Sequence, residues 1–190
     1  MAKLGNKKIA ILAADGFEES ELFSPLDALK DAGASVDIIS LKEGEVQGFR
    51  HMERGKSVKV DKEISHADVN EYDGLVIPGG LYNPDALRRD EKVIAFVRGA
   101  FARNLPVASI CHGPQVLISA DVVKGRKMTG FEAIQIDLKN AGADVSDEEV
   151  VVDKGLVTSR NPDDLPAFNK KLVEEFCEGK HDGQKKSVAA

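Results

Sequence analysis

The sequence predicts an α/β protein, a three-layer α/β/α sandwich in which helices cover both faces of a mostly parallel sheet. Two observations favour this class. Short, continuously apolar runs, typical of strands covered on both faces, recur along the chain. Stretches with helical spacing of apolar residues lie between these runs, and such strand–helix–strand units give parallel strands with right-handed crossovers.

The composition limits the classes of protein that fit. A chain of 190 residues fits one domain, and we expect residues 1–178 to form it and residues 179–190 to form a polar, frayed tail. The net charge of −6 argues against stable nucleic-acid binding. No apolar run approaches the roughly 20 residues that span a bilayer, and the N-terminus lacks the apolar core of a secretory signal.

Cysteine and histidine are scarce. The two cysteines, Cys111 and Cys177, lie far apart, which argues against a disulfide framework and favours a reducing cytoplasm. The four histidines form no cluster with cysteine, so we expect no metal site and no cofactor. His51 and His66 lie among charged residues, where we expect them to be solvated.

The first half of the chain predicts one β-α-β unit and then an excursion from the sheet. Residues 9–14 are a continuous apolar run that predicts the first strand of the unit, and residues 36–40 predict its second strand. Between them lies one helical stripe, made by Leu22, Leu26 and Leu29. Residues 43–68 are interrupted by glycines, and they predict a small hairpin that leaves the sheet toward another subunit.

The second half continues the alternation. Residues 72–78 and 105–110 predict two more buried strands, with an amphipathic helix between them. Residues 150–152 and 156–158 flank an Asp-Lys-Gly turn and predict a hairpin. We expect the last helix to open with Asn161 as its N-cap, followed by one stripe made by Leu165, Phe168, Leu172 and Phe176.

One cysteine lies where a strand turns sharply into a helix. An apolar run ends on Cys111, His112 follows at once, and Gly113-Pro114 precedes a second helical pattern. In hydrolases this layout is the nucleophile elbow, and a helix N-terminus favours the thiolate. The alternative is that Cys111 is only a small buried hydrophobic residue. Thiol hydrolysis needs a thiolate and a proton carrier, for which Cys111 and His112 are the candidates.

Other candidates follow two further predicted strands, and the carboxyl ends of parallel strands lie together at one edge of the sheet. Asp85 is the candidate to orient the imidazole, or else a helix N-cap. The amides of Gly80 and His112 are candidates for an oxyanion hole, or else the glycine only permits a tight turn. Glu18 is a candidate neighbour of the thiol of Cys111, or else it only favours the first turn of a helix.

These motifs resemble a known family. The Glu18 turn, residues 77–80 and above all residues 108–114 are similar to the PfpI family of intracellular cysteine peptidases. That family lies in the superfamily of the Parkinsonism-associated protein deglycase and the class I glutaminases. The similarity runs from about Lys7 to Phe176. The chain is also similar to the branch of general stress proteins and deglycases, and this similarity lies in residues 118–122 and 158–168.

The resemblance implies a flavodoxin-like, class I glutaminase-like fold and a role for each matching residue. Cys111 would be the nucleophile and His112 its partner, with the amides of Gly80 and His112 as oxyanion hole and Glu18 touching the thiol. The family works as homodimers or larger homo-oligomers. Its third triad member is a glutamate from a neighbouring subunit, and the matching residue here is the shorter Asp85.

We therefore expect a cofactor-free cysteine hydrolase, related to stress, that acts at a carbonyl carbon. Its substrate would be a peptide amide or an adduct of a dicarbonyl such as methylglyoxal, and its partner a second copy of itself. The alternatives are an oxidative-stress sensor that uses Cys111 and a holdase chaperone. A glutaminase is excluded because the only histidine after His112 is His181, in the polar tail.

Overall fold

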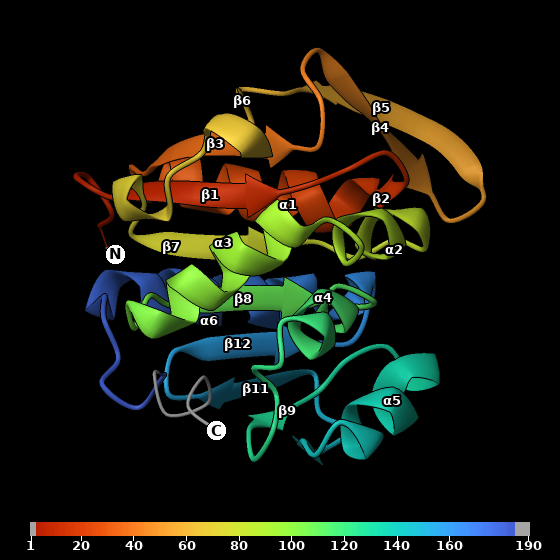
Figure 1. The fold of residues 1–190 in the computed structure, drawn as a ribbon, viewed down its shortest axis with the longest axis vertical. Helices are drawn as coiled ribbons and strands as arrows, with labels where there is room; N and C mark the ends of the chain where they lie inside the picture. Colours follow the sequence, from red (N-terminus) through yellow and green to blue (C-terminus); the bar gives the residue numbers. More distant parts are fainter. Residues whose placement is uncertain (1–2, 185–190) are drawn as a thin grey trace.

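The computed structural model describes residues 3–184, and within them the main sheet has seven strands (Figure 1). Their order is β11-β12-β8-β7-β1-β3-β6, and neighbours are parallel except for the antiparallel pair β11 and β12. The predicted mostly parallel sheet is therefore confirmed. The strands are β1 (Lys8–Leu12), β3 (Ser35–Ser40), β6 (Lys62–Glu63), β7 (Gly74–Ile77), β8 (Val107–Ile110), β11 (Val150–Asp153) and β12 (Leu156–Ser159).

Helices cover both faces of this sheet. In Figure 1, α3 crosses in front of the strands, while α1 and α6 lie behind them. Shorter helices stand at the edge toward which the strand arrows point. The bounds are α1 (Glu19–Asp31), α2 (Tyr82–Leu87), α3 (Glu91–Ala102), α4 (Pro114–Ser119), α5 (Gln135–Asn140) and α6 (Leu165–Glu178), with 3-10 turns η1 (Ile64–His66), η2 (Val69–Glu71), η3 (Glu132–Ile134) and η4 (Pro162–Asp164).

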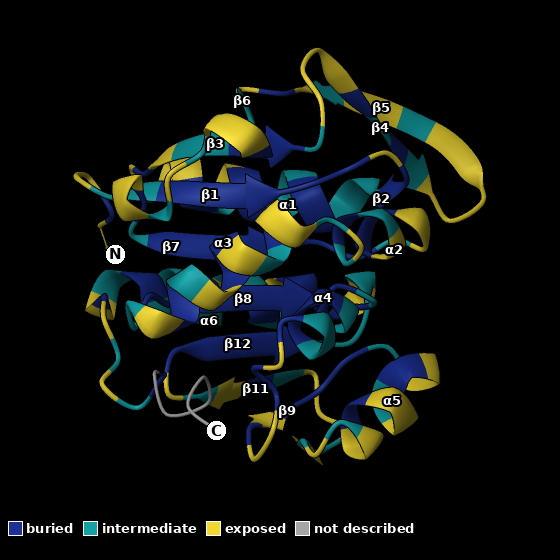
Figure 2. Cartoon of the chain, in the orientation of Figure 1, coloured by how far each residue is buried: buried dark blue, intermediate teal, exposed yellow. Residues whose placement is uncertain are grey.

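The sheet separates two apolar cores, which is why its strands are apolar without alternation. Along β1, Ala10 and Leu12 face the core beneath α3, whereas Ile9 and Ile11 face the core beneath α1 and α6. Successive side chains of a strand point to opposite faces, so both sets are buried, as the dark central strands of Figure 2 show. Among the helices within residues 3–184, none is long and apolar enough to cross a membrane.

Two small sheets lie outside the main one. The predicted hairpin is formed by β4 (Glu45–Arg50) and β5 (Glu53–Lys59), and β2 (Phe17–Glu18) adds a third, parallel strand. A second pair consists of β9 (Lys127–Met128) and β10 (Asp144–Val145). Because β2 directly follows the loop after β1, its pairing with β4 brings the hairpin to the carboxyl edge of the main sheet.

Buried Asn83 joins two loops at this edge. Its Oδ1 accepts a hydrogen bond from the amide of Ala14, 2.7 Å away, after β1. Its Nδ2 donates to the carbonyl of Pro78, 2.8 Å away, after β7. The parallel strands thus place the loops after β1, β7 and β8 together, as expected of this fold class.

The expectation of a frayed tail is wrong for residues 179–184. The side chain of Gln184 is fully buried, and its Nε2 donates to the carbonyl of Leu105 at 2.9 Å. Its Oε1 accepts from Nη2 of Arg126 at 2.8 Å, and Arg126 pairs with Asp153 at 2.7 Å. The buried guanidinium needs acceptors, and a polar side chain of the tail supplies one. Residues 185–190 lie outside the described residues.

Candidate active site

Cys111 stands at the end of β8 in a conformation that few residues adopt. Its φ is +60°, and its amide donates to the carbonyl of Ser159 at 3.1 Å. Left-handed backbone is uncommon outside glycine and costs of order 1 kcal/mol or more. Gly113 is required in the same turn because a Cβ there would lie 2.5 Å from Oγ of Ser109. The predicted nucleophile elbow is therefore formed, and the side chain of Cys111 is 7% exposed.

The carboxyl group beside the thiol belongs to Glu21 and not to Glu18. Glu21 lies on the first turn of α1 with its side chain fully buried, and its Oε2 accepts from the amide of Gly79 at 2.9 Å. A Cβ on Gly79 would lie 2.5 Å from that oxygen and 2.7 Å from Cβ of Cys111, which shows how closely the three residues pack.

Glu18 has a different partner. Its Oε2 accepts a hydrogen bond from the amide of His51 at 2.9 Å, and its Oε1 accepts from Oγ of Ser20 at 3.5 Å. The assignment of Glu18 as the neighbour of the thiol is thus corrected, because Glu18 ends β2 whereas Glu21, three residues later, points inward from the helix. The signal for Glu21 was a charged residue directly before Leu22 on the apolar stripe of α1.

The charges of Glu21 and Cys111 are linked. Burial raises the pKa of Glu21 to about 8, so its carboxyl group is mostly protonated at neutral pH. Burial and then the negative charge of Glu21 raise the pKa of the Cys111 thiol, while the amides of Gly80 and His112 lower it. The repulsion acts only when Glu21 is ionised. When Glu21 is protonated, its charge no longer raises the pKa of the Cys111 thiol, and its O–H group can donate a hydrogen bond to the thiolate.

The two amides predicted to form an oxyanion hole lie together at the sulfur. Both hydrogen-bond to the side chain of Cys111 and favour its thiolate. Gly80 has a φ of +85°, and a Cβ there would lie 2.3 Å from the carbonyl oxygen of Gly16. Glycine at this position therefore permits a left-handed turn and a close approach of two loops.

The imidazole of His112 is half-buried and rests against an aromatic ring. Its centroid lies 4.8 Å from that of Phe131, with 29° between the planes. Burial lowers the pKa of His112, which favours the neutral ring that can accept a proton. Within residues 3–184, no carboxylate hydrogen-bonds to this ring, so the chain does not supply the orienting group by itself.

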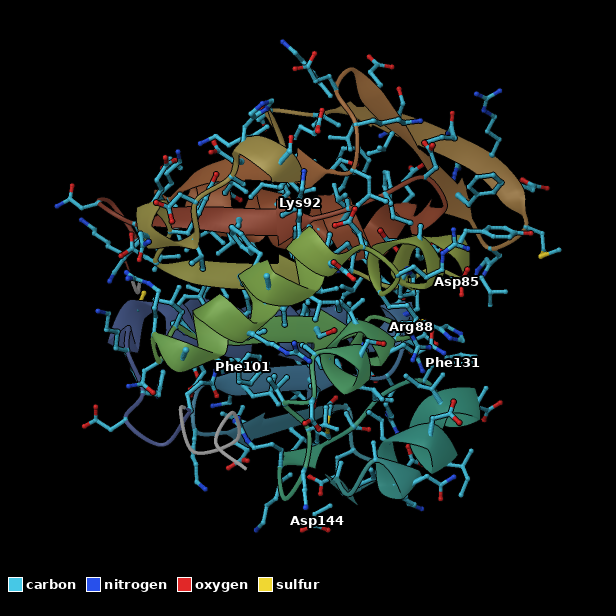
Figure 3. All side chains as sticks on the ribbon, in the orientation of Figure 1. Asp85, Arg88, Lys92, Phe101, Phe131 and Asp144 are labelled. Carbon is cyan, nitrogen blue, oxygen red and sulfur yellow. The ribbon has the colours of Figure 1, made fainter. Side chains whose placement is uncertain are left out.

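Asp85 is not brought to His112 within one chain. It lies exposed on α2, and the described part of the chain gives its carboxylate no hydrogen bond or ion pair. Figure 3 shows Asp85 at the same end of the molecule as Phe131, with Arg88 between their labels. Because α2 begins at Tyr82, Asp85 is not the N-cap of its helix either.

A cavity of about 380 Å³ opens over the thiol. It lies between the elbow, the hairpin and the turn before α6, and among its described lining residues none is Lys or Arg. His51 is exposed, as expected from the sequence, and it also lines this cavity. The lining residues are Glu18, Glu21, His51, Met52, Gly80, Leu81, Cys111, His112, Phe131, Asn161, Pro162 and Asp163.

A smaller hollow of about 160 Å³ adjoins this cavity at Gly80 and Leu81. Phe49, Met52 and Tyr82 give it an apolar and aromatic wall. The rings of Phe49 and Tyr82 lie 6.5 Å apart between centroids. The site therefore has room for a large apolar group next to the amide of Gly80.

Groups that are able to hold a metal ion lie elsewhere. Within residues 3–184, ligand atoms within 4.8 Å of one another occur in two sets, both apart from Cys111. The sets are Glu43, Glu63 and His66, and Glu175, Glu178 and His181.

Comparison with known proteins finds relatives along most of the chain. The chain is 50% identical over 169 residues to protein/nucleic acid deglycase 2 of Escherichia coli, covering 88% of this chain and 96% of that protein. It is 43% identical over 168 residues to general stress protein 18 of Bacillus subtilis, covering 88% and 96%. The crystal structure of Drosophila melanogaster DJ-1beta matches with a TM-score of 0.82 and 26% identity, covering 96% of this chain and 95% of that one. Residues 7–175 match the model of the DJ-1/PfpI family, and the chain belongs to that family.

Proposed function

We propose that this protein is a cofactor-free cysteine hydrolase that acts at a carbonyl carbon, with Cys111 as nucleophile and His112 as proton carrier. The observation that carries the proposal is the strained elbow at Cys111, where two amides reach the sulfur and a buried carboxyl group lies beside it. Strain of this kind concentrates at functional sites, and nucleophile, proton carrier and oxyanion donors are the parts that acyl transfer needs.

The geometry supports a defined first step. The neutral ring of His112 accepts the thiol proton while Sγ bonds to the carbonyl carbon, and the electron pair of the C=O double bond moves to oxygen. The amides of Gly80 and His112, which reach the sulfur, also reach an oxygen on the carbon bonded to it. The bond to the leaving group then breaks with its electron pair on that group, which takes up a proton, and the C=O double bond re-forms. Water gives up a proton as it adds to the thioester carbon, the C–S bond breaks, and the sulfur takes back the proton held by His112.

Two substrate classes fit this chemistry, peptide amides and adducts of dicarbonyls such as methylglyoxal. With an aldehyde, addition of the thiolate gives a hemithioacetal. The Escherichia coli relative is named a deglycase and the Bacillus subtilis relative a general stress protein, and these names support the second class and a role in stress. The expected location in the cytoplasm stays a proposal.

Substitution of the thiol tests the proposal. Methylglyoxal consumption and cleavage of a fluorogenic peptide are measured for wild type, Cys111→Ser and Cys177→Ala. Cys177 is the matched control because it lies on α6 and does not line the cavity. We expect Cys111→Ser to lose at least one of the two activities and Cys177→Ala to keep both. Unchanged rates for both reactions in that variant would refute the proposal.

A second candidate function is oxidation sensing at the same sulfur. The buried carboxyl of Glu21, with its raised pKa, can donate a hydrogen bond to a sulfinate at neutral pH. Two equivalents of peroxide convert the thiolate to sulfinate and release two waters. Mass spectrometry after mild peroxide is expected to find two added oxygens on Cys111 in wild type, and fewer in Glu21→Ala.

We also propose that a second copy of the chain covers the mouth of the cavity. Large apolar side chains stand exposed around it, with Met52 93%, Leu81 64% and Tyr82 68% exposed. Exposed apolar groups that gather on one face favour association. In such a dimer, Asp85 would approach the His112 of the other copy. Mixing inactive Cys111→Ser with Asp85→Ala is then expected to restore part of the activity, and light scattering is expected to give at least a dimer.

A further inference from the structure

The turn of the β4–β5 hairpin reaches the cavity that contains the thiol. His51 and Met52 form this two-residue turn, since Arg50 pairs with Glu53 on either side of it. In Figure 1 the hairpin runs from the end of the sheet near β6 to the side of β2 and α2. Both turn residues line the same cavity as Cys111 and His112.

Separate contacts hold the turn in place. Strand β2 pairs with β4 at Phe17↔Gly48 and Glu18↔Phe49. The carboxylate of Glu18 accepts the amide of His51 at 2.9 Å. A Cβ on Gly48 would lie 2.7 Å from the ring of Phe17, so the hairpin packs closely on β2. The turn is therefore a fixed wall of the cavity.

The residue at this turn is unusual for its backbone. His51 has a φ of +56°, a region in which glycine is the default. Histidine tolerates this region better than most residues, but glycine would form the turn at less cost. Within residues 3–184, the ring nitrogens of His51 have no hydrogen-bond or ion-pair partner, because only its backbone amide is engaged. The exposed side chain of His51 thus lines a cavity that contains a nucleophile, and the described residues leave its ring nitrogens free to take up or release a proton.

The reaction has a place for a second imidazole. His112 takes the proton of the thiol, and it lies on the elbow beside the sulfur. An amine leaving group needs a proton of its own, and imidazole is the side chain that exchanges protons near neutral pH. We propose that His51 is this second proton carrier, a catalytic residue that protonates the leaving nitrogen. The inference rests on the proposed hydrolase function.

Each proton in this reaction has a donor and an acceptor. Sγ bonds to the carbonyl carbon and the thiol proton passes to His112. The C–N bond breaks with its electron pair on nitrogen, and the imidazolium of His51 donates a proton to that nitrogen. Water then adds to the thioester carbon while the neutral ring of His51 takes its proton. The C–S bond breaks, the sulfur regains the proton held by His112, and the carboxylic acid leaves.

A comparison of leaving groups tests this role. An amine must be protonated to leave, whereas p-nitrophenolate leaves as an anion. N-acetylphenylalanine, whose side chain suits the aromatic hollow, is offered as its aminomethylcoumarin amide and as its p-nitrophenyl ester. The variants are His51→Asn and His51→Gly, which both suit the left-handed turn. His66→Asn is the matched control, because it is the same substitution in the same excursion, outside the cavity.

Amide hydrolysis is expected to fall about 10²-fold or more in both His51 variants, while the initial burst of p-nitrophenolate from the ester changes less than about threefold. Free imidazole in the buffer is expected to restore amide hydrolysis by His51→Gly. Equal loss with both substrates, or loss in neither, would overturn the role of His51. Cys111→Ser separates the two levels. Amide hydrolysis that is lost in Cys111→Ser but kept in the His51 variants overturns the role of His51 alone, whereas amide hydrolysis that survives in Cys111→Ser shows that Cys111 is not the nucleophile of this reaction.

Discussion

The buried carboxyl group of Glu21 gives the folded protein a distinctive dependence on pH. Its pKa rises from 4.5 to about 8 because burial disfavours the charged form. Between these values the unfolded chain releases this proton and the folded chain keeps it. Stability therefore falls as pH rises through this range, since the unfolded state binds fewer protons. Below pH 4.5 the group is protonated in both states and imposes no penalty.

The size of the effect follows from the two pKa values. At about 1.4 kcal/mol for each pH unit, the free energy of unfolding falls by about 3 kcal/mol at pH 7 and about 5 kcal/mol above pH 8. Glu21→Gln has nearly the same shape and no charge at any pH. Its amide oxygen still accepts from Gly79, and its amide group can donate to the sulfur of Cys111. We expect the variant to match wild type near pH 4.5 and to be increasingly more stable above it.

Urea unfolding of the two proteins at a series of pH values from 5 to 8 measures this difference. Glu132→Gln, at an exposed position, is the control and is expected to run parallel to wild type. A difference between Glu21→Gln and wild type that does not grow with pH would refute the reasoning. In that case the carboxyl of Glu21 would be ionised in the folded protein.

Three further outcomes follow from particular contacts. Gly80→Ala places a Cβ against the backbone of Gly16 in a left-handed turn, so this variant is expected to have a lower melting temperature and a lower kcat. An unchanged melting temperature would contradict the close approach of the loops that contain Gly16 and Gly80. Arg126→Met leaves the carboxylate of Asp153, whose side chain is 13% exposed, without its guanidinium partner. Urea unfolding is therefore expected to show a loss of about 3 kcal/mol, and a loss below about 1 kcal/mol would contradict a stabilising ion pair. Phe131→Ala exposes the ring of His112, which raises the pKa of this imidazole toward its ordinary value. The acidic limb of the kcat/KM profile is therefore expected to move to higher pH, and a shift to lower pH would contradict the effect of burial.

The fold was predictable because burial on two sides leaves a plain pattern. In β1 the residues Ile9 to Leu12 are apolar without alternation, and only a strand between two helical layers buries all of them. The sequence of β5 has no such pattern. It is mostly exposed and charged, and its strand is held by main-chain pairing with β4 and not by a core. The last helix begins later than expected, because Asn161 caps the 3-10 turn η4 and α6 starts at Leu165.

The site was predictable only where it is local in sequence. Cys111, His112 and the glycines around them follow strand ends, so topology alone brings them together. Whether Glu18 or Glu21 lies beside the thiol of Cys111 depends on the direction in which α1 leaves β2. The two residues are only three positions apart, so the sequence pattern does not distinguish them. The approach of His51 to Cys111 depends on a hairpin that pairs with β2, a contact between distant residues that no local pattern encodes.

The burial of Gln184 moves the boundary of the smallest unit that can fold. A carboxypeptidase that trimmed the chain back to Glu178 would remove the buried side chain of Gln184. The guanidinium of Arg126 would then lose one of its hydrogen-bond acceptors. Truncation designed from the end of the last helix would then yield a weakened protein. The carboxyl-terminal turn thus supports the chain before β8 and the ion pair of Arg126 with Asp153, and through His181 it also contacts Glu175 of α6.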